Sequence, residues 1–64
     1  MGQDFYPDIV VILKEHGYVY VATRGSHEKW RNPATGKTVT VPKTSKSRHT
    51  FNAVLKQAGI DKKL

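Results

Sequence analysis

His27 is the residue of this chain most suited to acid–base chemistry at neutral pH, because histidine changes its charge in that range. It follows Gly25-Ser26, a dipeptide typical of a two-residue hairpin turn of type II′ in which glycine takes a positive φ. Such a turn pairs Arg24 with His27 and places Lys29 and Arg31 on the same face of the sheet. A histidine held among cations on an open face suits the binding or cleavage of a polyphosphate.

The same turn predicts the register of the two strands that it joins. Continued pairing opposes Thr23 with Glu28, Ala22 with Lys29, Val21 with Trp30, and Tyr20 with Arg31. On this register Trp30 points inward with Val21 and packs in the core. Tyr20 points outward, where its ring either stacks on a nucleic-acid base or forms a cation–π pair with Arg31.

RNA cleavage is the reaction that these residues fit. It needs a base for the 2′-hydroxyl proton, an acid for the leaving 5′-oxygen, and cations for the charge that develops on the phosphate. His27 can serve as base or acid, and arginine or lysine can stabilise the charge. The chain has only five carboxylates, and none are spaced like a metal cage. We therefore expect no metal and no cofactor, and Ser26 lacks the partners of a hydrolase triad.

Two further histidines have weaker claims to a function. His49 follows Arg48 in the first turn of a predicted helix, where it either contacts a phosphate held at the helix N-terminus or is simply solvated. His16 lies at the end of another predicted helix, where a cation favours the helix dipole, and we expect a structural role for it.

Positive charge is concentrated in the middle of the chain. The net charge is +6, and residues 24–48 hold seven basic residues against Glu28 alone. A concentrated basic surface favours an anionic partner, most often a nucleic acid, although simple solubility is the alternative. The predicted RNA-binding residues are Arg24, Lys29, Arg31, Lys43, Lys46, Arg48 and His49.

Length and composition predict one small domain spanning residues 1–64. With 38% hydrophobic residues its core is thin, and without cysteine it has no disulfide to reinforce it. No apolar run is long enough to cross a membrane, and the start shows no signal-peptide pattern. We therefore expect no membrane association, and the absence of cysteine fits a cytoplasmic location.

The pattern along the chain predicts an α+β domain of order α-β-β-β-α. Pro7, as the first helical residue, and Gly17, as the stop, bound a helix over 7–16. Alternating residues predict strands over 18–24, 27–32 and 37–41, and Ser47 caps a second helix that ends at Gly59. We expect a three-stranded antiparallel sheet with both helices on one face. They would cover Val19, Val21, Trp30, Val39 and Val41, with Arg31 opposite Thr38 and Trp30 opposite Val39. Ile9, Ile12 and Leu13, with Val10 beside them, form the apolar stripe of the first helix, and Phe51, Val54, Leu55 and Ala58 form that of the second.

Three stretches resemble the HicA-type toxins of bacterial toxin–antitoxin pairs, and the likeness covers nearly the whole chain. They are Gly25-Ser26-His27-x-x-Trp30, the strand Thr38–Pro42, and the ending Leu55–Ile60. The opening helix followed by Gly17-Tyr18 is similar too. The resemblance implies a double-stranded-RNA-binding-domain-like fold, cleavage of mRNA, neutralisation by a HicB-type antitoxin, and a catalytic role for His27.

Two positions depart from the pattern of the family. Lys43 stands where many members have a histidine, so a second catalytic imidazole is not expected in that loop. His49 begins a His-Thr-Phe stretch where many members read Gly-Thr-Leu, and Phe51 keeps the apolar position. The sequence thus predicts a metal-independent endoribonuclease toxin. The alternatives are a non-catalytic RNA-binding module of the same fold and a protein-interaction domain for an acidic partner.

Overall fold

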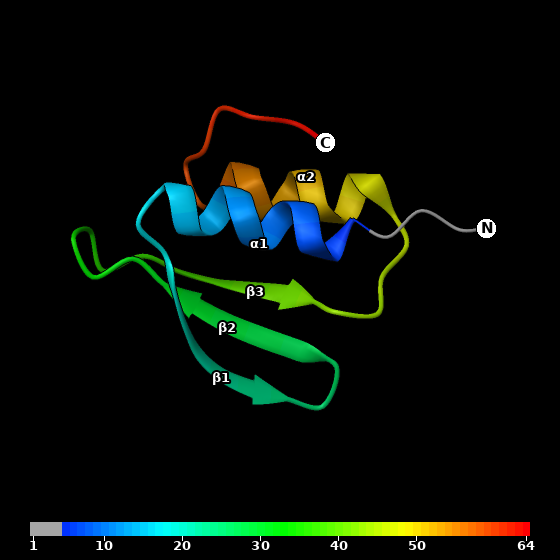
Figure 1. Cartoon of the computed structure of the whole chain (residues 1–64), viewed down its shortest axis with the longest axis horizontal. Helices are drawn as coiled ribbons and strands as arrows, with labels where there is room; N and C mark the ends of the chain where they lie inside the picture. Colours follow the sequence, from blue (N-terminus) through cyan, green and yellow to red (C-terminus); the bar gives the residue numbers. More distant parts are fainter. Residues whose placement is uncertain (1–4) are drawn as a thin grey trace.

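The chain folds into two helices and one three-stranded antiparallel sheet. The computed structural model describes residues 5–64, so the first four positions of the predicted domain lie outside the described residues. The elements follow the order α1 (Tyr6–Glu15), β1 (Val19–Arg24), β2 (His27–Arg31), β3 (Thr38–Pro42) and α2 (Arg48–Gln57) (Figure 1). The strands are arranged β1-β2-β3. The predicted α-β-β-β-α fold is confirmed.

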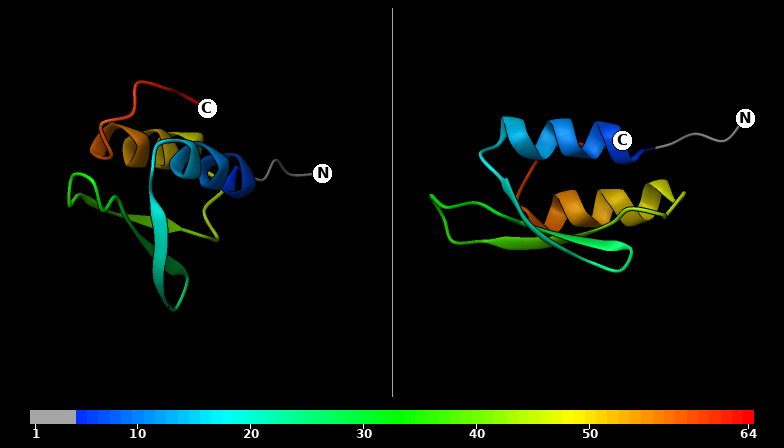
Figure 2. Two further views of the ribbon diagram at one scale, coloured as in Figure 1. Left: turned by 60° about the vertical axis from the view of Figure 1, so that its left-hand side comes forward. Right: turned by 60° about the horizontal axis from the view of Figure 1, so that its bottom comes forward.

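Both helices lie on the same side of the sheet, where α2 packs on β3 and α1 packs against α2 (Figure 2). At the edge of the sheet opposite β3, the β1–β2 hairpin projects away from the helices. The core therefore forms between the helices, β2 and β3. Its members are Ile9, Leu13, Tyr18, Trp30, Val39, Val41, Phe51, Val54, Leu55, Ala58 and Ile60.

Each helix ends at a glycine that reverses the chain. Gly17 has a φ of +86°, and the amide of Tyr18 donates to the carbonyl of Leu13 at 2.9 Å. Gly59 has a φ of +74°, and the amide of Ile60 makes the same bond to Leu55 at 2.9 Å. In both cases the residue after the glycine is a buried apolar residue, as in a Schellman motif.

The predicted helix starts are close to those observed. Ser47 caps α2 and its hydroxyl accepts from the amide of Thr50 at 3.4 Å, as expected. Helix α1 begins at Tyr6, so Pro7 occupies the second helical position rather than the first. Both positions lack an intrahelical partner for the amide, so proline is tolerated at either one.

The hairpin turn fixes the pairing next to it and then the register shifts. Gly25 has a φ of +58° and Ser26 does not have a positive φ, which agrees with the predicted type II′ turn. Three predicted pairs near the turn are present: Arg24 with His27, Thr23 with Glu28, and Ala22 with Lys29. A β-bulge then takes Val21 out of the pairing, so that Tyr20 opposes Trp30 and Val19 opposes Arg31. The predicted pairs Val21–Trp30 and Tyr20–Arg31 are wrong.

The bulge also changes where Tyr20 lies. Its ring meets the ring of Trp30 edge-on, with centroids 5.9 Å apart and an angle of 77° between the planes. The predicted outward position opposite Arg31 is therefore wrong. Tyr20 still remains half exposed, because β1 lies beyond the reach of the helices.

The predicted apolar face is confirmed for β2 and β3 but not for β1. Trp30, Val39 and Val41 are buried, and the predicted pairs between β2 and β3 are present. Val19 and Val21, in contrast, are 50% and 47% exposed. Beyond the bulge Val19 opposes Arg31, so it lies on the face of the sheet away from the helices. The hairpin also extends past the helices, and β1 keeps its valines in solvent.

Candidate functional site

His27 is the first residue of β2 and lies directly after the hairpin turn. Its partners in the sheet are Arg24 on β1 and Pro42 on β3. The side chain is exposed, whereas the next residue, Glu28, is buried. Alternation along β2 therefore directs His27 to the face of the sheet away from the helices. The turn and two neighbouring strands hold its backbone in place while its imidazole remains accessible.

Two cations lie on the same open face as His27. Lys29 and Arg31 alternate with the buried residues Glu28 and Trp30, so both side chains are directed away from the core. Arg24 is exposed and directly opposite His27. The predicted grouping of His27 with these three cations is thus present in the fold.

Lys43 is brought beside the hairpin turn by a backbone hydrogen bond. Its amide donates to the carbonyl of Ser26 at 2.8 Å, although the two residues are far apart in sequence. Lys46 lies in the exposed loop that leads from β3 to α2. The hairpin turn, the end of β3 and the start of α2 all lie at one end of the molecule (Figure 1). Arg24, Lys43, Lys46 and Arg48 come from separate stretches of the sequence and therefore lie at the end of the sheet that holds the hairpin turn.

The first two residues of α2 are a cation that contacts an aromatic ring and an exposed histidine. The guanidinium carbon of Arg48 lies 5.8 Å from the centroid of the Phe5 ring, a cation–π contact directed toward the start of α1. His49 is exposed in the first turn of the helix. Of these two predicted RNA-binding residues, Arg48 already contacts another side chain of the protein, whereas His49 is exposed.

Glu28 is a buried carboxylate whose role the sequence did not reveal. It is only 7% exposed, and one of its oxygens accepts from the hydroxyl of Tyr6 at 2.5 Å and from Nε1 of Trp30 at 3.1 Å. Burial, together with the hydrogen bond to this carboxylate and its charge, raises the pKa of Tyr6 to about 12. These bonds connect the start of α1 to the residue that follows His27, so they fix the hairpin relative to the helices.

The one available signal for this role was the position of Glu28 on β2. Glu28 and Trp30 are two residues apart on the strand, so their side chains lie on the same face of the sheet. This spacing places a charged residue on the core-facing side. A carboxylate in that position needs hydrogen-bond donors. Tyr6 lies 22 positions earlier in the chain, and no spacing rule identifies it as the donor.

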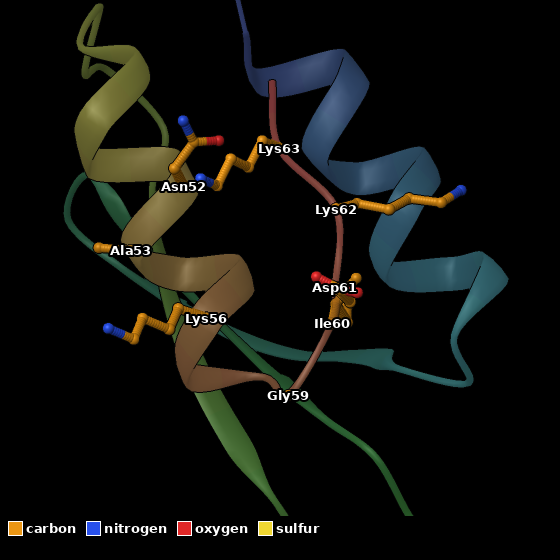
Figure 3. Close-up of a pocket in the computed structure, with 8 residues that line it drawn as sticks. All are labelled: Asn52, Ala53, Lys56, Gly59, Ile60, Asp61, Lys62 and Lys63. Atoms are coloured by element: carbon orange, nitrogen blue, oxygen red, sulfur yellow. The ribbon is translucent and has the colours of Figure 1, made fainter.

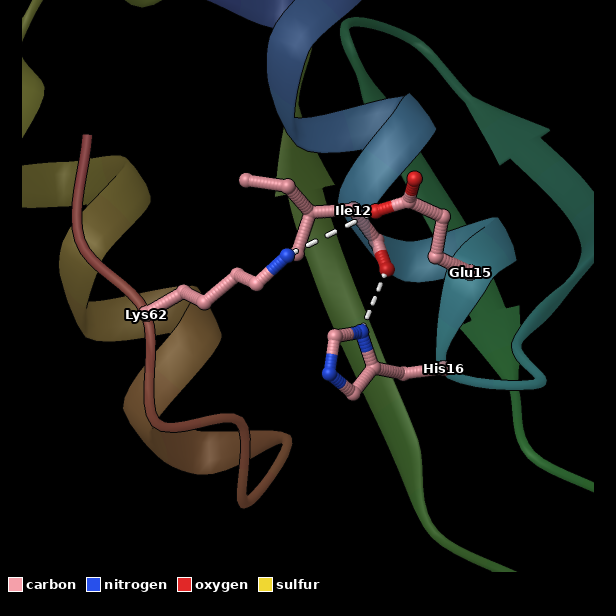
Figure 4. Close-up of polar contacts among 4 residues, drawn as sticks. All are labelled: Ile12, Glu15, His16 and Lys62. Carbon is pink, nitrogen blue, oxygen red and sulfur yellow. Dashed lines mark hydrogen bonds and ion pairs between the residues drawn. The ribbon is translucent and has the colours of Figure 1, made fainter.

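His16 has the structural role expected of it. Its Nδ1–H donates to the carbonyl of Ile12 at 2.9 Å, at the end of α1 (Figure 4). Nearby, Lys62 forms an exposed ion pair with Glu15 at 3.6 Å, which ties the segment after α2 to α1. These contacts lie in the helix layer and take no part in the site around His27.

Two surface hollows differ in the chemistry that they offer. The hollow at the hairpin is lined by Val21, Ala22, Thr23, Arg24, His27, Glu28, Lys29 and Thr40. Another lies between α2 and the segment that follows it, and its lining includes Lys56, Lys62 and Lys63 (Figure 3). These three lysines point in different directions, so they do not focus on one anion. Of these two hollows, the one at the hairpin places a histidine beside cations.

Among residues 5–64, no group of three or more histidine or acidic side chains is placed to hold a metal ion. In the same part of the chain, neither helix has the length and apolar character required to span a bilayer.

The fold and the site define a small basic α+β domain with an accessible histidine among cations. Residues 6–60 match the family described as the HicA toxin of bacterial toxin–antitoxin systems. The chain belongs to this family, and it is therefore a toxin whose family implies an antitoxin partner. No curated protein and no solved structure matches the chain closely enough to be counted as similar.

Proposed function

We propose that this toxin is an endoribonuclease that cleaves mRNA in the cytoplasm with His27 as its catalytic residue. The observation that carries the proposal is the placement of His27. It is exposed at a rigid turn, opposite Arg24 and on one face with Lys29 and Arg31. Membership of a toxin family supports a harmful activity of this kind.

In the proposed reaction, the 2′-hydroxyl of a nucleotide attacks the adjacent phosphate and the 5′-oxygen of the next nucleotide leaves. The imidazole of His27 either accepts the hydroxyl proton or donates a proton to the leaving oxygen. Arg24, Lys29 and Arg31 bind the phosphates and stabilise the charge that accumulates in the transition state. His49 is the candidate for the second proton transfer, because it is exposed in the first turn of α2, which begins at the same end of the molecule as the hairpin turn.

The remaining predicted cations extend this binding surface. Lys43 lies beside the turn, and Lys46 lies in the loop before α2. Both would hold phosphates on either side of the cleaved bond. Arg48 contributes less to RNA binding than these lysines, since its guanidinium already contacts Phe5. We further propose that the antitoxin implied by the family is of the HicB type and blocks this surface.

The test of the catalytic role is cleavage of a long RNA, followed on a gel, by the wild type and three histidine variants. His27→Ala removes an exposed imidazole and leaves no cavity, so it should fold and bind RNA like the wild type. Its cleavage rate should fall about 10²–10⁴-fold, the usual cost of losing a positioned acid or base. His16→Ala should cut at the wild-type rate, and His49→Ala should show an intermediate loss if His49 is the second group.

Circular dichroism controls for folding, and a chelator added to the reaction tests the independence from metal ions. Wild-type cleavage should persist with the chelator and vary between pH 5 and 8, where histidine side chains change charge. A folded His27→Ala protein that cuts RNA as fast as the wild type would leave a non-catalytic RNA-binding module as the function.

A further inference from the structure

Among residues 5–64, no strand lies beside the outer edge of β1. In the order β1-β2-β3, β1 pairs only with β2, and each of its six residues is exposed. The outward N–H and C=O groups of an edge strand are free to pair with another chain. The helices do not cover this edge, because the hairpin projects away from them (Figure 2).

The same strand carries a run of large apolar side chains. Val19, Tyr20 and Val21 are 50%, 51% and 47% exposed. Among the residues that the structure describes, the other large apolar side chain with such exposure is Val11 on α1, at 55%. Single exposed apolar residues are ordinary. Here Val19 shares the face of Arg31 and Tyr20 shares the face of Trp30, so both faces of the open edge carry exposed apolar side chains, which favours an interaction surface.

The charges around this edge select the kind of partner. The hairpin exposes Arg24, Lys29 and Arg31, whereas its one acidic side chain, Glu28, is buried between hydrogen-bond donors. A second copy of this chain would bring identical cations together. The bulge at Val21 also adds twist, which opposes the pairing of two identical edges. RNA, for its part, would leave the valines and the backbone groups unused.

We propose that the antitoxin docks an extended acidic segment along β1 and adds a fourth strand to the sheet. This inference rests on the antitoxin partnership in the proposed function. Main-chain hydrogen bonds supply affinity in this mode of binding, and alternate side chains supply specificity. Apolar residues of the segment cover Val19 and Val21, and its carboxylates meet Arg24 and Arg31. Because Arg24 is the strand partner of His27, the docked segment lies beside the proposed catalytic residue.

Two matched substitutions separate this edge from the rest of the surface. Val19→Glu places a negative charge on the edge, and Val11→Glu makes the same change at an equally exposed valine on α1. Binding of the purified antitoxin encoded with this toxin is measured by calorimetry. Val19→Glu should weaken binding about 10–100-fold, in the range of a central interface residue, and Val11→Glu should leave it unchanged. Circular dichroism should show that both variants are folded like the wild type.

Hydrogen exchange of the wild type gives a second measurement that needs no variant. Amides of β1 should become protected when the antitoxin binds, and those of the exposed loop at Thr44 should not. Equal affinities of Val19→Glu and the wild type, or unprotected β1 amides, would overturn the docking site and leave the proposed function intact. An antitoxin that does not bind the wild type would overturn the partnership itself.

The other possible occupants of the edge give distinct results. If the toxin alone sediments as a dimer and Val19→Glu makes it a monomer, a second copy occupies the edge. If RNA alone protects the outward amides of β1 from exchange, the edge belongs to the RNA path. Either result contradicts an acidic protein segment as the occupant.

Discussion

β3 and β1 are the two outer strands of one sheet, yet the helices cover only β3. Val39 and Val41 on β3 are 3% and 0% exposed, while every residue of β1 is exposed. The difference arises because α2 packs on β3 and the hairpin extends beyond both helices. Stability therefore depends on one half of the sheet, and the other half is available for binding and chemistry.

The largest expected loss of stability follows from removing Trp30, the buried apolar residue of the central strand. It packs in the core and also anchors the ring of Tyr20. Trp30→Ala should lower the free energy of unfolding by about 3–5 kcal/mol, much of the stability of a domain of this size. Chemical denaturation measures this change. A loss below about 1 kcal/mol would show that the hairpin does not depend on the core.

Matched valine substitutions on the two outer strands test the comparison directly. Val39→Ala removes buried methyl groups and should cost about 2 kcal/mol. Val19→Ala changes a half-exposed side chain and should stay within about 0.5 kcal/mol. Thermal unfolding of both variants gives the comparison. Equal losses would mean that β1 is covered in solution.

The Tyr6–Glu28 bond joins the two halves and gives stability a defined pH dependence. Tyr6→Phe removes a hydrogen bond to a carboxylate and should cost about 1.5–3 kcal/mol at pH 8. Folding raises the pKa of Tyr6 from 10.0 to about 12, so the folded state favours the protonated phenol. The stabilisation is therefore complete below pH 10 and is lost as the pH rises through 12.

Denaturation of the wild type and of Tyr6→Phe at a series of pH values measures this dependence. The difference between the two proteins should shrink between pH 10 and 12. A constant difference across that range would indicate that Tyr6 does not donate to Glu28. Substitution by phenylalanine retains the ring and its packing, so it isolates the hydroxyl.

The smallest effects on stability should come from the cations of the open face. Lys29→Ala and Arg31→Ala change exposed side chains and should shift unfolding by less than about 0.5 kcal/mol. Each should reduce the salt dependence of RNA binding by about one unit of slope, because one phosphate contact is lost. Lys14→Ala, an exposed cation of α1, is the matched control. Unchanged slopes in both variants would move the RNA path toward Lys46 and Arg48.

Local signals in the sequence were sufficient for most of the fold. Glycines at the ends of both helices, the Ser47 cap and the Gly25 turn act within a few residues, so their effects could be read from neighbouring positions. The grouping of His27 with Arg24, Lys29 and Arg31 followed from the same turn and from strand alternation.

The features that could not be predicted depend on contacts between distant parts of the chain. The bulge at Val21 has no signature of its own, and without it the alternation of Val19 and Val21 resembles a buried strand. Whether a helix covers β1 depends on how the two helices pack on the sheet and on each other, which local sequence signals do not specify. The Tyr6–Glu28 bond and the contact of Arg48 with Phe5 likewise join elements that meet only in the folded chain.

The segment after α2 determines where a tether can be attached. Leu64 packs against the core, and its amide donates to the side-chain oxygen of Asn52 at 2.7 Å. This residue lies over the helices, on the side opposite the open face of the sheet (Figure 1). A dye, an affinity handle or any further polypeptide joined to Leu64 would extend outward from the helix side of the molecule. Surface immobilisation through this point would keep both His27 and the edge of β1 directed toward the solution.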